Sequence, residues 1–328
     1  MKIEKPNFWN KKYSFFSIIL FPISIFFQIT TFVKRIFVQQ KKFNIPIICV
    51  GNIYVGGTGK TPLSIKIAEM INNIGRKPVI IKKYYSQLAD EIDLIKDKGV
   101  NLIQDKNRVD AIKESENKKY DVAILDDGFQ DASIKKNLNI LCFNEKQLIG
   151  NGLIIPAGPL RQSLNYIKDS QIILINGNHN KSFEKKINKI SSKIKIFYSS
   201  YLPLNIIKFK NRKLLAFAGI GNPENFFNLL RENDLEVKKT ISFPDHYKYN
   251  KNEMNKLLKT AKESQLELVT TEKDHFRLKK MGYTDISHID VKLKIEKEEE
   301  LIEELKKYLW LKSLNIYLRA FLYTYFFW

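Results

Sequence analysis

The sequence predicts an α/β fold, because strand-like apolar runs alternate with amphipathic helix-like segments along most of the chain. The first such unit joins an apolar run at 45–50 to an amphipathic segment at 63–74 through a turn with three glycines in four positions. A second series of strands and helices begins near residue 205, after a lysine-rich helix. We therefore predict an N-terminal segment, a mostly parallel sheet domain, a second, smaller α/β domain and a C-terminal tail, bounded as 1–35, 36–205, 206–311 and 312–328.

The N-terminal segment contains an uncharged, phenylalanine-rich run, 13–33, that is long enough to span a bilayer, which needs about 20 residues. Lys11 and Lys12 precede this run, and Lys34 and Arg35 follow it. A spanning helix usually carries its basic excess on one side, whereas symmetric basic flanks favour a helix that lies in the interface on anionic lipid. We predict a membrane-associated helix here, with a buried core helix as the alternative.

The glycine-rich turn has the composition of a phosphate-binding loop. Its residues are Gly56, Gly57, Thr58, Gly59, Lys60 and Thr61. Glycines let backbone N–H groups point inward at the positive end of a helix, where they cradle phosphate oxygens. We expect Lys60 to reach the β- and γ-phosphates and the Thr61 hydroxyl to bind Mg²⁺. Tyr54 stands where the usual pattern has a glycine. The turn predicts a P-loop NTPase-type domain, with a plain strand-to-helix turn as the alternative.

A second chemical signal lies at 121–130, where four apolar residues lead into Asp126 and Asp127. This is the form of the strand that supplies a magnesium-organising carboxylate beside a P-loop. Further along, a loop rich in glycine and proline ends at Arg161, whose guanidinium could stabilise charge on a transferring phosphoryl group. A loop without a catalytic role is the alternative for that segment.

The second domain and the tail carry weaker signals. A strand at 213–219 ends in glycines, and a strand at 266–270 leads into the charged run 271–274. The aromatic stretch 316–328 predicts a second interfacial segment, or else a tail that is disordered or packs against the first helix.

Composition sets wide limits on function. The net charge of +20, from 55 basic and 35 acidic residues, indicates a polyanionic neighbour: nucleic acid, an acidic membrane surface or a phosphorylated substrate. A genome rich in Lys, Asn and Ile codons would produce the same excess. The two cysteines, Cys49 and Cys142, lie in apolar runs and form no disulfide framework or metal-ligand spacing. A reducing cytosol is the expected compartment of the enzyme body.

Six motifs together resemble the tetraacyldisaccharide 4'-kinases of lipid A synthesis. In chain order they are 51–62, 126–130, 156–161, 216–221, 243–246 and 270–274. The resemblance implies an ATP-dependent lipid kinase that moves the γ-phosphate to the 4' hydroxyl of a tetraacyl glucosamine disaccharide 1-phosphate. It implies ATP and Mg²⁺ as cofactors, and the lipid A disaccharide precursor and an inner-membrane phospholipid surface as partners. It also implies the cytoplasmic face of the bacterial inner membrane, with neither nucleic acid nor an obligate protein partner expected.

The resemblance also implies roles for individual residues. Asp90 matches the family's catalytic base, and His246 the histidine that pairs with it. Because these two residues lie in different predicted domains, the prediction requires a cleft that brings them together. The implied cofactor-binding residues are Gly56, Gly57, Thr58, Gly59, Lys60, Thr61, Gln130 and Arg161, and the implied metal ligands are Thr61, Asp126 and Asp127. Lys60 also counts among the catalytic residues.

The chain departs from the family at three places. Residues 82–86 replace a Ser-Arg-Gly-Tyr-Gly loop, Asp131 stands where a histidine is usual, and Gln162 replaces a glutamate. Two other classes of function stay open at this stage. A membrane-surface P-loop ATPase switch would hydrolyse nucleotide without an acceptor, and a nucleic-acid binder would bind DNA with steep salt dependence.

Overall fold

The computed structural model describes residues 6–85, 89–245 and 247–309, which form two compact units. The larger unit comprises, among the described residues, 6–83, 100–199 and 295–309. The smaller unit comprises 84–99 and 200–294, less the residues outside the described ranges. The predicted C-terminal tail, 312–328, lies outside the described residues.

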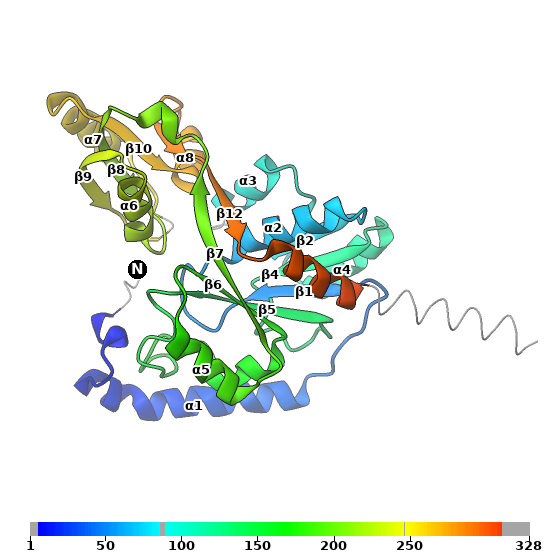
Figure 1. The fold of residues 1–328 in the computed structure, drawn as a ribbon. Helices are drawn as coiled ribbons and strands as arrows, with labels where there is room; N and C mark the ends of the chain where they lie inside the picture. The colour runs from blue at the N-terminus through cyan, green and yellow to red at the C-terminus, as the bar shows by residue number, and fades with distance from the viewer. Residues whose placement is uncertain (1–5, 86–88, 246, 310–328) are drawn as a thin grey trace, which may run out of the picture. The chain divides into compact units, whose positions relative to one another are not determined.

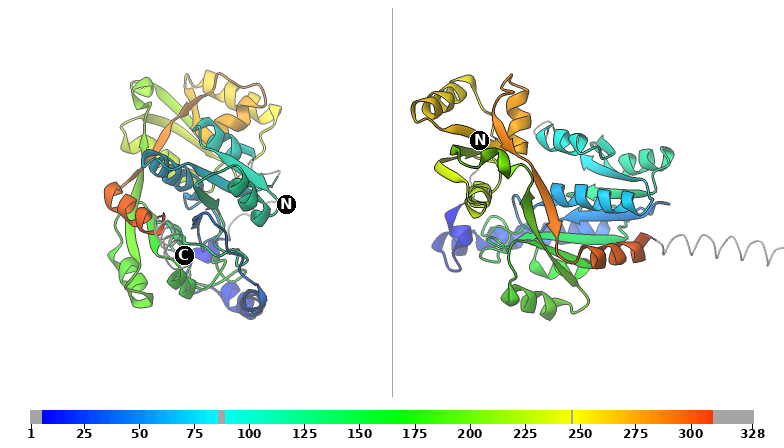
Figure 2. Two further views of the ribbon diagram at one scale, coloured as in Figure 1. Left: turned by 90° about the vertical axis from the view of Figure 1, so that its right-hand side faces the viewer. Right: turned by 45° about the horizontal axis from the view of Figure 1, so that its top comes forward.

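The larger unit is built on an eight-stranded sheet with the order β12-β7-β6-β5-β1-β4-β2-β3 (Figure 1 and Figure 2). The strands of this sheet are β1 Ile47–Gly51, β2 Pro78–Lys83, β3 Leu102–Asp105, β4 Val122–Asp126, β5 Leu138–Asn144, β6 Ile172–Asn176, β7 Lys195–Pro203 and β12 Val291–Ile295. Residues 200–203 of β7 and 291–294 of β12 belong to the smaller unit. The pairings from β3 across to β7 are parallel. Strands β1, β4 and β6 are buried along their whole length, which explains why they read as continuous apolar runs. The predicted mostly parallel sheet is confirmed.

Helices of the larger unit lie against this sheet or against the loops that follow its strands. They are α1 Phe15–Phe37, α2 Lys60–Asn73, α4 Arg108–Asn117 and α5 Lys181–Ile190, with short 3₁₀ helices η1 Asn7–Asn10 and η3 Leu164–Asp169 and a further helical stretch at 298–309. One apolar cluster joins alternate residues of the central strands to α4 and α5, for example Ile47 and Cys49 to Ile112 and Ile187. Strand and helix periodicities therefore meet in this cluster, whereas the alternate strand residues Ile48 and Val50 are buried but lie outside it.

The smaller unit has a four-stranded parallel sheet of order β11-β10-β8-β9. Its elements are β8 Lys213–Ala218, β9 Glu236–Ser242, β10 Glu267–Thr271 and β11 Ser287–Ile289, with α3 Ala89–Asp97, α6 Pro223–Glu232, α7 Lys251–Glu263, α8 Glu272–Lys279 and the 3₁₀ helix η4 Ile206–Phe209. Strand β8 shows the period of two, because Leu214 packs with α6 whereas Leu215 packs with α7. The second, smaller α/β domain is thereby confirmed as a fold.

Helix α3 belongs to the smaller unit, although the chain places it between β2 and β3 of the larger unit. The helical residues after 295 belong to the larger unit, although the smaller unit precedes them. The two compact units thus divide the chain differently from the predicted domains, which put 36–205 together and 206–311 together. The functional reading of those domains stays a prediction.

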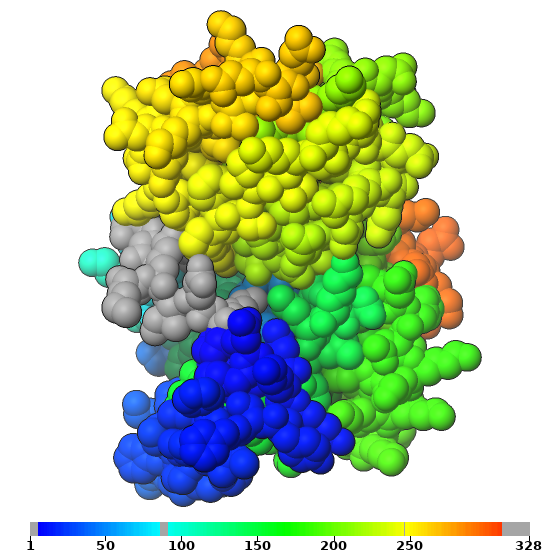
Figure 3. All heavy atoms as spheres, turned by 90° about the vertical axis from the view of Figure 1, so that its left-hand side faces the viewer, coloured from blue at the N-terminus to red at the C-terminus, as the bar shows by residue number. Residues whose placement is uncertain are grey.

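Helix α1 is the one described helix that is long and apolar enough to cross a membrane, by length and composition alone. Its only buried residues are Ser17 and Ser24, while Phe16 is 61% exposed and Phe26 is 69% exposed. In Figure 3 the side chains of this blue segment stand at the surface of the face that is shown. The helix therefore presents its polar edge to the protein and its apolar surface outward.

Candidate nucleotide and metal site

The glycine-rich turn lies between the carboxyl end of β1 and the first residue of α2, Lys60. Gly56 has φ of 120° and Gly59, the N-cap of α2, has φ of 86°, a conformation that side chains with a Cβ rarely adopt. Gly57 lies exposed between them. The open N–H groups at the start of α2 and the glycine conformations together make the anion-binding end that the sequence predicted.

Two amides and a core tyrosine brace this turn. The Asn52 side-chain amide donates to Thr58 Oγ1 over 2.9 Å and to the Gly56 carbonyl over 3.3 Å. Gln130 Nε2 donates to the Asn52 carbonyl over 2.7 Å. This predicted cofactor-binding residue therefore supports the turn indirectly, through Asn52. Tyr54, at the position of the missing glycine, is 1% exposed and fills the core. The departure at Tyr54 therefore changes the packing beneath the turn and leaves its glycines in place.

Asp126 ends strand β4 and is buried, with 1% exposure. Thr61 Oγ1 donates to its Oδ2 over 2.9 Å, and Ser64 Oγ lies 3.4 Å from its Oδ1. The hydroxyl and carboxylate oxygens that the sequence proposed as metal ligands are thus in contact. Because hard oxygen donors of this kind are what Mg²⁺ prefers, this donor set fits the ion.

Asp127 follows with a positive φ of 57° and turns its carboxylate toward two cations. Arg161 Nη1 contacts its two oxygens at 3.0 and 3.1 Å, and Lys60 Nζ lies 3.8 Å from Oδ1. Burial alone would raise the pKa of Asp127, but Lys60 and Arg161 outweigh it and hold that pKa below its ordinary value. The structure therefore brings together all the charged residues that the sequence assigned to this end of the sheet.

Lys82 is a site residue that sequence reasoning missed. It lies in β2 directly opposite Asp126 of β4 in the parallel register, and its side chain is only 5% exposed. Its ammonium forms an ion pair with Asp126 Oδ2 and lies 3.4 Å from Thr61 Oγ1. Lys82 thus contacts both proposed metal ligands. The signal was present in the sequence, because Lys82 is the last residue but one of β2, the strand beside the one that ends in Asp126.

Arg108 and Asp131 hold the turn after β4 in place. Arg108 Nη2 donates to the Asp127 carbonyl over 2.7 Å, and Nη1 lies 3.4 Å from Asp131. Asp131, where the family usually has histidine, also accepts from the Ser133 hydroxyl over 2.6 Å. Ser133 and Arg108 give this carboxylate defined partners, and they keep its pKa lowered although burial would raise it. The departure at Asp131 is thus absorbed by local hydrogen bonding.

The predicted base and its histidine are only partly within the described structure. Asp90 is the second residue of α3, and its side chain is outside the description, as is His246 altogether. Helix α3 belongs to the smaller unit, and so do the described residues on both sides of position 246. The dyad itself stays a prediction.

Three of the family-like motifs meet in the smaller unit. The Gly219 N–H donates to Asp274 Oδ2 over 2.8 Å, and Tyr249 donates to Asp274 Oδ1 over 3.0 Å. A Cβ at Gly219 would lie 3.0 Å from the Tyr249 hydroxyl and 3.1 Å from the Tyr247 Cβ, so the loop after Phe243 closes over a residue without a side chain. The ring of Phe243 completes this junction by packing 5.1 Å from that of Tyr249.

Comparison with known proteins identifies the family. The sequence profile described as Tetraacyldisaccharide-1-P 4'-kinase matches residues 16–309. A tetraacyldisaccharide 4'-kinase of Pelagibacter ubique is 40% identical over 314 residues, covering 94% of this chain and 98% of that protein. A protein of the same name from Rickettsia canadensis is 31% identical over 326 residues, covering 94% and 98%. The crystal structure of LpxK from Aquifex aeolicus in complex with ATP shares the fold, with a TM-score of 0.69, 24% identity and coverage of 89% and 99%. This chain belongs to the tetraacyldisaccharide-1-P 4'-kinase family.

Proposed function

We propose that the glycine-rich turn of the larger unit binds ATP and that its γ-phosphate passes to the 4' hydroxyl of the lipid A disaccharide precursor. The observation that carries this proposal is the meeting of Lys60, Thr61, Asp126 and Asp127 at the carboxyl ends of β1 and β4. Ligands of open parallel sheets bind at this edge. The named activity of the relatives supplies the acceptor.

Charge neutralisation is the main task of these residues, because phosphoryl transfer needs little covalent chemistry from the protein. Lys60 and Arg161 both point to the Asp127 carboxylate, so two cations stand ready beside the turn. In the proposed complex they exchange this carboxylate for phosphate oxygens. Thr61 and Asp126 would hold Mg²⁺, with Asp127 near them. When bound, that ion would neutralise charge on the phosphate oxygens.

Asp90 is the proposed general base. It would take the proton of the sugar hydroxyl while the N-terminal turn of α3 presents its carboxylate. The family-like loop that includes His246 is anchored by Tyr249 and Phe243, as described above. A histidine on that loop would orient the carboxylate. The support for these two roles is the motif match together with the position of α3 in the same compact unit as the loop.

Helix α1 supports a membrane-bound position for the enzyme. Ser24 Oγ donates to the Ile154 carbonyl over 2.8 Å and accepts from the Ala157 N–H over 3.0 Å, while Asn151 Nδ2 donates to Ser17 Oγ over 3.1 Å. These bonds attach the helix through its serines and leave its phenylalanines outward. We propose that this apolar surface enters the phospholipid interface on the cytoplasmic face of the inner membrane, where ATP is supplied.

The test is direct. Purified protein is incubated with γ-labelled ATP, Mg²⁺ and a tetraacyl disaccharide 1-phosphate in mixed micelles, and the lipid products are separated. Label in a lipid that carries a phosphate at the 4' position is expected. Release of labelled phosphate at the same rate with and without the acceptor, with no labelled lipid, would instead identify an ATPase switch.

A further inference from the structure

Helix α3 is a short and highly charged helix. It has nine residues, of which four are acidic and one is basic, and among its described side chains, those of 91–97, the buried apolar ones are Leu94 and Ile95. An apolar stripe of this size is too small to fix a helix by itself, since isolated helices shorter than about 12 residues are marginal in water. The contacts that its charged side chains make therefore add to this small apolar contact in holding the helix.

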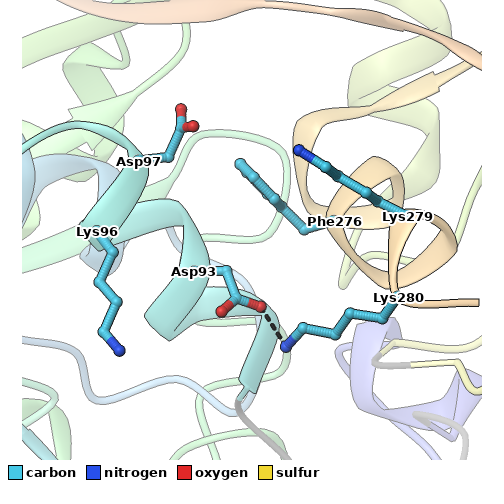
Figure 4. Close-up of a pocket in the computed structure, with 6 residues that line it drawn as sticks. All are labelled: Asp93, Lys96, Asp97, Phe276, Lys279 and Lys280. Carbon is cyan, nitrogen blue, oxygen red and sulfur yellow. Dashed lines mark ion pairs between the residues drawn. The ribbon is translucent and has the colours of Figure 1, made fainter. Parts of the chain in front are cut away.

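Those contacts are ion pairs with the segment 272–280, which consists of α8 and the residue after it. Glu91 binds Lys273 over 2.7 Å, and Lys98, just after α3, binds Glu272 over 2.6 Å. Asp93 forms a third pair with Lys280, which Figure 4 shows across the open groove between the two helices. The first two pairs are mostly shielded from water, because Glu91 is 15% and Glu272 is 9% exposed at the side chain.

The charges that α3 presents differ in sign between its first residues and the residue that follows its end. Glu91 and Asp93 of α3 meet Lys273 of α8 and Lys280, the residue after α8, whereas Lys98, which follows α3, meets Glu272, the first residue of α8. A sliding or reversed packing would bring like charges together, which costs free energy. The arrangement therefore fixes one register between the two helices.

The start of α8 is itself fixed to the sheet. Thr271 caps the helix by accepting from the Asp274 N–H over 3.2 Å, and its hydroxyl donates to Asp274 Oδ2 over 2.8 Å. Asp274 is fully buried and accepts from Gly219 and Tyr249 as well. In the motif 271–274, the first and last residues thus hold α8 in place, and the two middle residues reach α3.

We propose that Glu272 and Lys273 are positioning residues that set where α3 presents the carboxylate of Asp90. The inference rests on the proposed role of Asp90 as the base. Lys273 acts on Glu91, the next residue in the chain, so it both holds the first turn of α3 and neutralises the charge beside the base. Glu272 secures the other end of the helix through Lys98.

The decisive variant is Lys273→Met, which keeps the length of the side chain and removes its charge. We expect kcat to fall about 10- to 100-fold, since a misplacement of about 1 Å can cost about 10² in rate. The KM for ATP should stay within about twofold, because Lys273 is not among the residues of the turn. Lys273→Arg, which can keep the ion pair, should restore most of the rate.

The Asp90→Ala background separates positioning from a general loss of structure. If Lys273 acts through the base, adding Lys273→Met to Asp90→Ala should lower the residual rate by less than about twofold. The same fractional loss in both backgrounds would overturn the proposal. Normal turnover of Asp90→Ala alone would instead remove the base assignment on which it rests.

Hydrogen exchange gives a readout that does not depend on catalysis. The amides of α3 should exchange faster in Lys273→Met than in the parent protein. Lys259→Met is the matched control, because Lys259 pairs with Glu263 within α7 at 3.7 Å and is exposed. Unchanged exchange in α3 of the Lys273 variant would overturn the proposal that Lys273 positions α3, whatever the role of Asp90.

Discussion

At the scale of single residues, Lys60 carries the assignment of the nucleotide site. Replacing it by alanine should lower lipid phosphorylation by about 10³-fold or more, because the turn amides remain while the charge on the transferring phosphoryl group is uncompensated. The label-transfer assay measures this loss. The melting temperature should stay close to that of the parent, since Lys60 Nζ lies 3.8 Å from its carboxylate partner. Near-normal turnover by the folded variant would contradict the assignment.

Lys82 leads to a second residue-scale prediction. The variant Lys82→Ser leaves the buried Asp126 carboxylate without its ion-pair partner, which should lower the free energy of unfolding by about 3 kcal/mol in the presence of a chelator. Mg²⁺ with ATP should then raise the melting temperature more in this variant than in the parent, because Asp126 and Thr61 become more available to the cation.

The control for Lys82→Ser is Lys77→Ser. Lys77 directly precedes the first residue of β2, its side chain is exposed, and its ammonium lies over the Tyr120 ring. It should show the parent's response to Mg²⁺. Equal gains from Mg²⁺ and ATP in all three proteins would mean that Lys82 and the metal do not compete for the same oxygens.

The residues of the nucleotide site were largely predictable. Lys60 and Thr61 follow from motif spacing, and Asp126 follows from the rule that the carboxyl ends of parallel strands share an edge. Lys82 was not predicted, because its contact depends on the β2–β4 register and because the loop after it differs from the family pattern. The role of Gln130 behind the turn likewise depends on tertiary contacts that spacing does not encode.

At the scale of elements, α1 makes the membrane proposal testable. The double variant Phe16→Ser, Phe26→Ser should weaken binding to anionic phospholipid vesicles about 100-fold or more, because burying each phenylalanine contributes roughly 1.5–3 kcal/mol. Vesicle flotation measures this change. Ile207→Ser in η4, at a side chain that is 83% exposed, is the control and should bind as the parent does.

Deletion of residues 1–35 is the broader form of this test and should shift the protein from the membrane to the soluble fraction. The deletion would also remove the serine contacts with the loop after Asn151, so its melting temperature must be compared with that of the parent. A truncated protein that stays fully bound would point to the aromatic segment 316–328 as the anchor.

The sequence predicted α1 as a helix, but it did not predict the partners of α1 or of α3. In α1, large apolar side chains occur on every side, which hides the fact that Ser17 and Ser24 lie on one edge two turns apart. Glu91 in α3 and Lys98 just after it join this helix to the smaller unit, and their partners are 182 and 174 positions away in the chain. Local periodicity carries no information about such distant charge pairing.

At the scale of the whole molecule, the two units have separate apolar cores, and we expect a ligand to stabilise them unequally. A non-hydrolysable ATP analogue at 100 times its Kd stabilises the state that binds it by about 2.7 kcal/mol. Amide exchange should slow in α2 and β4 of the larger unit and change little in β8 and α7 of the smaller unit. Equal slowing throughout would show that the units open as one cooperative body.

The division of the chain between the units has a genetic consequence. In the described part, the chain passes from one unit to the other after Lys83, Gly99, Ser199 and Lys294. A single crossover or a single stop codon therefore cannot separate one unit intact from the other. A gene fragment for residues 200–294 alone would lack α3 and would leave Glu272 and Lys273 without the partners described here. We expect such a fragment to need residues 84–99 supplied as a second chain, which makes the two pieces a natural pair for a split-protein complementation assay.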